Sequence, residues 1–266
     1  MRYEVLGPLR VNDGGEFSFI SARKIETVLA VLLIRADQVV APEELMAEIW
    51  ADRPPRRATA GLHVYISQLR KFLQRPDQDG NRIVTRPAGY LLNKGGDDID
   101  FHDLLRLADQ GRAALREGRR EDAEVLLEEA LGLWHGPVLG DLRGGSGDVR
   151  CGPIVEGFTT WMAELRLECL ELLAEAQLEM GRHRELVGRL YSLTAENPLR
   201  ESFYRQLMLA LYRSERQADA LKVYHSARDT LRDELGLEPC RALRELQQAI
   251  LVDDRELDLL AVSSAS

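Results

Sequence analysis

The segment from Arg56 to Leu73 has the clearest helical periodicity near the N-terminus. Its apolar side chains fall on one stripe of a 3.6-residue helix, at Leu62, Ile66, Leu69 and Leu73. The opposite side is neutral or basic, with Arg57, Ala60, Val64, Ser67, Gln68 and Lys71. A solvated helix face usually mixes both signs of charge, so a face without acidic residues favours a polyanionic partner. A basic surface helix packed on a core fits this pattern equally well.

A β-hairpin is predicted ten residues further on. Ile83–Thr85 and Tyr90–Leu92 are β-prone, and Pro87–Gly89 can form the turn between them. Arg86 stands at the bend, where its guanidinium can project freely. An ordinary surface hairpin would have the same sequence features. A helix that can enter one groove, beside a hairpin that can reach a second, is the arrangement of a winged-helix DNA-binding domain.

Shorter elements precede this pair. Strands are predicted at Tyr3–Leu6, Leu9–Val11, Phe17–Ile20 and Val39–Val40. One helix is expected from a Ser21 cap to about Arg35, and a second from Pro42 to Trp50. Together these elements predict the order three strands, helix, strand, helix, third helix and hairpin.

Two helix starts suggest anion contacts. Arg23 and Lys24 lie in the first turn of the first helix, where positive charge opposes the helix dipole. A nearby anion would explain them, and so would the local carboxylate of Glu26. Thr59 lies near the start of the third helix, where it can cap free N–H groups or leave them to a phosphate.

The second half of the chain is helical and repetitive. Turns are predicted at Gly118, Gly181 and Glu215, and the last two are 34 residues apart, the period of a tetratricopeptide repeat. After each turn, small or apolar residues follow at five, nine and twelve positions: Ala123, Leu127, Ala130; Leu186, Leu190, Leu193; Ala220, Tyr224, Ala227. Simple bundle packing would explain one such hairpin, but three in one phase favour a repeat. The Gly-rich segment from Gly136 to Gly157 is expected to be a loop insertion.

These elements predict a mainly α protein with a small β component. An N-terminal winged helix-turn-helix is expected over residues 1–95, followed by an all-α tetratricopeptide-like domain over residues 98–252. Residues 253–266 are expected to form a flexible polar tail.

Charge is divided unevenly between the two parts. A net charge of −9, taken for the chain as a whole, opposes DNA binding. However, the first 95 residues contain 14 basic and 11 acidic side chains, a net of +3, which leaves 21 basic and 33 acidic side chains and a net of −12 for the remainder. A weakly positive domain with its basic residues on one face can still bind phosphates.

Composition excludes several classes of protein. The three cysteines, Cys151, Cys169 and Cys240, are far apart, so neither a disulfide framework nor a zinc site is indicated. The sequence has no apolar run of membrane-spanning length and no secretory leader, so a cytoplasmic protein is expected. It has no nucleotide-binding, metalloprotease or hydrolase motif, which predicts neither an enzyme nor a cofactor.

A family resemblance rests on longer phrases. The order of elements, with LRKFL at Leu69–Leu73 and TRPAGY at Thr85–Tyr90, resembles the OmpR/PhoB-type winged helix. ARKIETVLAVLL, LMAEIW and LHVYISQLRKFL are more narrowly similar to the Streptomyces antibiotic regulatory protein family. The segment from Asn197 to Pro239 closely resembles the bacterial transcriptional activator domain of these regulators.

The resemblance implies roles for individual residues. Outward residues of the third helix would read bases in the major groove: Val64, Ser67, Gln68 and Lys71. The wing residue Arg86 would reach a minor groove or phosphate. The DNA backbone would be contacted by Lys24, Arg56, Arg57 and Thr59. Many OmpR/PhoB-type domains have arginines where this chain has Ser67 and Gln68. Since Gln68 can read adenine and Val64 can touch a thymine methyl group, a modest, partly A·T-based readout is expected.

The family also implies a biological role. Its members activate secondary-metabolite (antibiotic) genes by binding promoter direct repeats as paired protomers and recruiting RNA polymerase holoenzyme. This chain would then be a nucleoid-associated homodimer on double-stranded DNA. Two alternatives remain: a protein-interaction adaptor, and a sensor with a small molecule in its helical groove. An adaptor would tolerate loss of Arg86 and Lys71, whereas a sensor predicts a ligand-dependent rise in thermal stability.

Overall fold

The computed structural model describes the chain except residues 52, 75–79, 144–150 and 253–266. It contains two units, each described separately below. The first contains residues 1–107 and 130–167, and the second contains residues 108–129 and 168–266. The predicted tail lies outside the described residues.

A four-stranded sheet opens the first unit. The strands β1 (Arg2–Glu4), β2 (Arg10–Asp13) and β3 (Glu16–Ser18) form an antiparallel meander. The short strand β7 (Asp98–Ile99) pairs in parallel with the free edge of β1. The first three strands confirm the prediction within a few residues, whereas β7 was not predicted.

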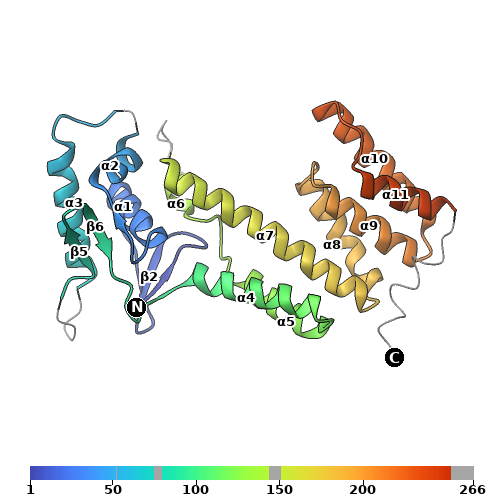
Figure 1. Ribbon diagram of the computed structural model, residues 1–266, viewed down its shortest axis with the longest axis horizontal. Helices are drawn as coiled ribbons and strands as arrows, with labels where there is room; N and C mark the ends of the chain where they lie inside the picture. Colours follow the sequence, from blue (N-terminus) through green and yellow to red (C-terminus); the bar gives the residue numbers. More distant parts are fainter. Residues whose placement is uncertain (52, 75–79, 144–150, 253–266) are drawn as a thin grey trace. The chain divides into compact units, whose positions relative to one another are not determined.

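Three helices and a second sheet complete the winged-helix part (Figure 1). The helices are α1 (Arg23–Ile34), α2 (Pro42–Trp50) and α3 (Ala58–Phe72). The strands β4 (Val39–Val40), β5 (Ile83–Arg86) and β6 (Gly89–Leu92) form an antiparallel sheet in the order β4-β6-β5. The apolar run Val28–Leu33 of α1 is fully buried and forms the centre of the core. The predicted order of elements is therefore confirmed.

Two predicted helix caps are wrong. The helix α1 takes Ala22 as its N-cap, so Ser21 lies one residue too early to bond the first free N–H groups. Likewise, α3 has Arg57 at its N-cap and no side-chain cap. Thr59 already lies inside α3, and its hydroxyl is directed at Sδ of Met46, 3.9 Å away.

The second unit is built from antiparallel helices. Helices α4, α5 and α7 cross the limits of the two units, and α8–α11 lie wholly in the second: α4 (Asp100–Arg116), α5 (Arg120–Gly132), α7 (Pro153–Glu179), α8 (His183–Glu196), α9 (Glu201–Arg213), α10 (Gln217–Leu235) and α11 (Arg241–Leu251). The three predicted turn residues separate α4 from α5, α7 from α8, and α9 from α10. Gly118, Gly181 and Glu215 adopt left-handed φ values of 75°, 77° and 62°. All nine residues predicted to face inward after these turns are buried, which confirms the tetratricopeptide-like repeat.

The segment 136–157 differs from the prediction of a loop insertion. It contains the short helix α6 (Gly140–Arg143) and the beginning of α7 at Pro153. Residues 144–150 of this segment lie outside the described residues. The N–H of Leu139 donates to the carbonyl oxygen of Val5, just after β1, and the N–H of Ile154 donates to Glu48 of α2. The segment is therefore packed within the first unit.

Across the residues that the structure describes, no helix is both long and apolar enough to cross a membrane.

Candidate nucleic-acid interface

The helix α3 has one buried and one exposed face. Ala58, Leu62, Ile66 and Leu69 point into the core. The four predicted base-reading residues are all exposed on the other side: Val64, Ser67, Gln68 and Lys71. Val64 is 52% exposed, which is unusual for an apolar side chain in the middle of a helix packed on a core. The face therefore offers an apolar contact, two hydrogen-bonding groups and a cation along one line.

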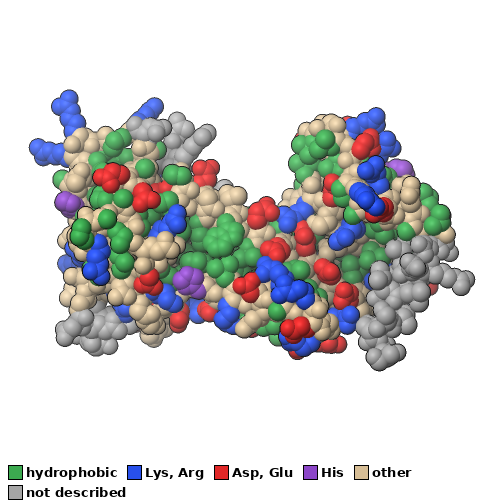
Figure 2. Space-filling model, viewed as in Figure 1, with side chains coloured by type: hydrophobic (Ala, Val, Ile, Leu, Met, Phe, Trp, Pro, Cys, Tyr) green, Lys and Arg blue, Asp and Glu red, His purple; other side chains and the backbone are tan. Residues whose placement is uncertain are grey.

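The start of α3 concentrates positive charge. Arg53, Arg56 and Arg57 are exposed, and the first turn of the helix has no acidic residue. Figure 2 shows Lys and Arg side chains projecting from the part of the first unit where Figure 1 draws the connection between α2 and α3. Since the N-terminus of a helix carries partial positive charge and free N–H groups, this end suits an anion such as a phosphate.

Lys24 lies over the ring of Trp50, which in turn neighbours Tyr65 on α3. Its Nζ lies 5.5 Å from the ring centroid of Trp50, whose ring is 6.0 Å from that of Tyr65 on α3. Lys24 remains exposed and free to meet an anion. Its neighbour Arg23 instead donates a hydrogen bond to the carbonyl oxygen of Leu142. Arg23 thus has a structural contact that the sequence did not suggest.

The wing presents Arg86 at its tip. Arg86 ends β5, pairs with Gly89 of β6, and is exposed. The turn itself is formed by Pro87 and Ala88. Gly89 has a φ of 147°, and a Cβ there would overlap the carbonyl oxygen of Val40. Glycine is therefore required for the hairpin to lie against β4.

Arg70 fixes the wing to α3, the recognition helix of the winged-helix fold. This role was not predicted from the sequence. The Nε of Arg70 donates to the carbonyl oxygen of Ile83 at 2.9 Å, and its Nη2 donates to Oγ1 of Thr85 at 2.7 Å. Both acceptors belong to β5. Arg70 lies between the buried and the exposed faces of α3. This position on the helix was the one feature of the sequence that could have indicated a contact with the wing. The contact sets the position of the hairpin relative to the base-reading face.

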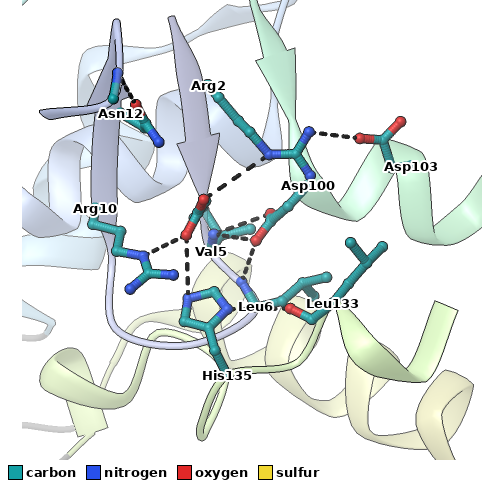
Figure 3. Close-up of polar contacts among 11 residues, drawn as sticks. Arg2, Val5, Leu6, Arg10, Asn12, Asp100, Asp103, Leu133 and His135 are labelled. Carbon is teal, nitrogen blue, oxygen red and sulfur yellow. Dashed lines mark hydrogen bonds and ion pairs between the residues drawn. The ribbon is translucent and has the colours of Figure 1, made fainter. Parts of the chain in front are cut away.

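A buried carboxylate binds the backbone that follows β1 in the first sheet (Figure 3). Asp100, the first residue of α4, accepts hydrogen bonds from the backbone N–H groups of Val5 and Leu6 at 2.9–3.0 Å. Burial raises the pKa of Asp100 to about 6, although the two N–H donors act in the opposite direction. His135 adds a backbone N–H to the Leu6 carbonyl at 3.1 Å, and its ring lies 3.7 Å from the Glu4 carboxylate.

A second buried carboxylate joins α2 to α7. Glu48 accepts hydrogen bonds from the N–H groups of Ile154 at 2.6 Å and Val155 at 3.3 Å. Burial raises the pKa of Glu48, and the two N–H donors partly offset that effect. The helix that precedes the recognition helix is therefore tied to the first turn of α7 within the same unit.

Side chains that could bind a metal or act as nucleophiles are dispersed in the parts of the chain that the structure describes. Within the described parts of the chain, no three His, Cys, Asp or Glu side chains gather as metal ligands. Burial raises the pKa of the Cys169 thiol to about 11, so it remains protonated at neutral pH. His63 is exposed on α3.

Comparison with known protein families divides the chain in two. Residues 21–92 match the family "Transcriptional regulatory protein, C terminal", and residues 99–251 match "Bacterial transcriptional activator domain". The second match covers more than half of the chain.

Individual relatives align along nearly the whole chain. Regulatory protein AfsR of Streptomyces griseus is 38% identical over 97% of this chain, which spans only 25% of AfsR. Regulatory protein DnrI of Streptomyces peucetius is 36% identical over 97% of this chain and 94% of its own length. A structure of Mycobacterium tuberculosis EmbR, in complex with a low affinity phosphopeptide, superposes with a TM-score of 0.89 at 33% identity, covering 99% of this chain and 69% of EmbR. The chain thus belongs to the Streptomyces antibiotic regulatory protein family of transcriptional regulators.

Proposed function

We propose that the protein is a sequence-specific, DNA-binding transcriptional activator. In this proposal residues 1–95 bind DNA and residues 98–252 act as the activator domain. The supporting observation is the exposed face of α3 beside a wing that Arg70 holds in place. This geometry can fill a major groove with the helix and reach the next groove with Arg86.

Each proposed base-reading residue would make a different kind of contact. Gln68 has the donor and acceptor pair that matches an adenine edge, and Val64 can contact a thymine methyl group. Ser67 accepts several bases, while Lys71 adds charge at the end of the face. Because α3 has no exposed arginine at its centre to read guanine, phosphate contacts would supply much of the affinity.

The phosphate contacts are proposed to come from the periphery. Arg56 and Arg57 stand at the start of α3, Lys24 stands beside them on the Trp50 ring, and Thr59 lies in the first turn. Arg86 supplies the contact at the other end of the interface. Together they would set the register of α3 in the groove without choosing the sequence.

The biological role is proposed from the family. The protein would pair as a homodimer on promoter direct repeats, recruit RNA polymerase holoenzyme, and activate antibiotic or other secondary-metabolite genes at the nucleoid in the cytoplasm. DnrI and AfsR, both named regulatory proteins of Streptomyces, support this reading through their similarity over nearly the whole of this chain.

Selection of genomic DNA fragments on the purified protein at near-physiological salt tests the proposal. We expect recovery of a tandem direct repeat upstream of a gene cluster, and its loss in the double variant Arg86→Ala/Gln68→Ala. Arg184→Ala is the matched control, because Arg184 is exposed on α8 in the second unit. Only salt-sensitive, sequence-independent binding would contradict the proposal and favour an adaptor.

Single variants separate phosphate contacts from base readout. Arg86→Ala should weaken binding to all sequences and reduce the slope of log affinity against log salt by about one unit. Gln68→Ala should leave that slope unchanged and relax specificity at one base pair. An unchanged salt slope in Arg86→Ala would refute the assigned role of the wing.

A further inference from the structure

The second unit contains a groove between three of its helices. Side chains of α7, α9 and α11 line it, and it has a volume of about 510 Å³. Its apolar lining consists of Leu178, Leu209, Ala242, Leu246 and Ala249. This volume lies within the range of sites that hold small organic ligands.

Positive charge runs along α9 through the middle of the groove. Arg205, Leu209 and Arg213 follow one another at intervals of four residues, on one side of the helix. Arg205 is exposed and, among the residues that the structure describes, makes no hydrogen bond or ion pair. Arg213 donates to the carbonyl oxygen of Leu178 at 3.1 Å, which holds its guanidinium at the groove wall.

Two of the three carboxylates that line the groove are paired with arginines outside it, which leaves Glu175 as the one facing Arg205. Glu179 is paired with Arg120 at 2.6 Å, and Glu245 with Arg241 at 2.6 Å. Burial raises the pKa of Glu175, the third carboxyl group, and Arg205 acts in the opposite direction. A ligand with its own carboxylate would therefore find Arg205 available for a charge-assisted hydrogen bond.

A buried amide adds a second, independent signal. Gln206 lines the groove and is only 6% exposed. Its Nε2 donates to the carbonyl oxygen of Glu171 at 2.8 Å, but its Oε1 has no donor among the described residues. A buried acceptor without a donor is unfavourable, so a ligand N–H would satisfy it. The amide or a neighbouring side chain must shift slightly to let that N–H approach.

We propose that this groove is a binding site for a small amphiphilic molecule of the N-acyl amino acid type. The acyl chain would cover Leu178, Leu209 and Leu246, the carboxylate would bind Arg205, and the amide N–H would meet Oε1 of Gln206. The proposal concerns the second unit alone and does not depend on DNA binding.

Isothermal titration calorimetry of the full chain with N-octanoylglycine tests the site. Two analogues each remove one feature: N-octanoylsarcosine lacks the amide N–H, and the methyl ester of N-octanoylglycine lacks the carboxylate. We expect saturable binding of N-octanoylglycine and at least about tenfold weaker binding of each analogue. Because the protein is unchanged in these comparisons, a folding defect cannot produce the difference.

Protein variants locate the site. Arg205→Gln should weaken N-octanoylglycine binding about tenfold, whereas Arg184→Gln on α8 should leave it unchanged. Equal binding of all three ligands would indicate unspecific apolar contact and overturn the proposal. Absence of saturable heat, or wild-type affinity in Arg205→Gln, would overturn it as well.

Discussion

The carboxylate of Glu48, near the end of α2, accepts a hydrogen bond from the backbone N–H of Ile154 at 2.6 Å, across 106 residues of sequence. Ile154 is the second residue of α7, so a side chain of one helix satisfies the free N-terminal groups of another. Gly152 allows this approach, since a Cβ there would lie 2.5 Å from Cδ of Glu48. The helix before the recognition helix and the start of α7 therefore form one packed structure.

Removing that acceptor should destabilise the protein. Glu48→Leu leaves the N–H groups of Ile154 and Val155 buried without acceptors, and we expect a loss of about 1–3 kcal/mol in the free energy of unfolding. Glu48→Gln keeps one acceptor oxygen and avoids the buried charge, so its loss should be smaller. Urea denaturation measures both, with the exposed Glu43→Gln on the same helix as control. Equal stability of Glu48→Leu and wild type would show that the contact contributes nothing.

Asp100 should make stability depend on pH. Its folded pKa of about 6 lies above the ordinary value of 3.8, so its contribution is complete below pH 3.8 and is lost as the pH rises through 6. Between pH 4 and pH 7, wild type should lose about 2–3 kcal/mol relative to Asp100→Asn, which cannot ionise. Parallel pH profiles of the two proteins in chemical denaturation would contradict this assignment.

Arg70 should influence DNA affinity without contacting DNA. Arg70→Met removes the hydrogen bonds to Ile83 and Thr85, so the wing loses its fixed position beside α3. We expect about five- to tenfold weaker binding in fluorescence anisotropy, equivalent to about 1–1.5 kcal/mol. Combining Arg70→Met with Arg86→Ala should add little, since both act through the wing. Fully additive losses would show that Arg70 acts elsewhere.

Gly89 should tolerate no side chain. Gly89→Ala places a Cβ against the carbonyl oxygen of Val40 and forces an alanine into a φ of 147°. The loss of unfolding free energy should be at least about 3 kcal/mol, because both strain and overlap oppose the native hairpin. Gly96→Ala is the matched control, since a Cβ there meets nothing within 4 Å. Thermal denaturation of the two variants gives the comparison.

Replacing Glu215 with glycine should stabilise the protein. Glu215 adopts a φ of 62° at the turn between α9 and α10, where the two equivalent turns have Gly118 and Gly181. Glu215→Gly should raise the stability by about 0.5–1 kcal/mol, because glycine enters the left-handed region without strain. Glu215→Ala should give no such gain. A lower melting temperature for Glu215→Gly would contradict this explanation.

Elements with a strong local signal could be predicted from the sequence. Pro42 and Trp50 bound α2 as predicted, since proline fixes the first helical position and the apolar spacing defines the rest. The small and apolar residues after each repeat turn were equally informative, because helix crossings select them wherever they occur. The outward face of α3 followed from periodicity alone.

Contacts between distant residues could not be predicted in this way. Nothing local marks Glu48 or Asp100 as acceptors for N–H groups of a remote segment. The two-residue strand β7 is too short to show an alternation of polar and apolar residues. Its pairing with β1 is decided by tertiary packing. The glycines of segment 136–157 suggested a loop, whereas Gly136 lies against the connection between β1 and β2, and Gly152 allows close approach of the backbone to α2.

The parallel pairing of β7 with β1 has a consequence for dissecting the chain. A fragment that ends at residue 95 would lose β7 and Asp100 together. β1 would then become an edge strand, and the N–H groups of Val5 and Leu6 would face solvent or another molecule. Open strand edges pair with each other, so such a fragment should self-associate. A fragment intended to isolate the winged helix would have to extend past the first turn of α4, so that β7 and Asp100 still cover this edge.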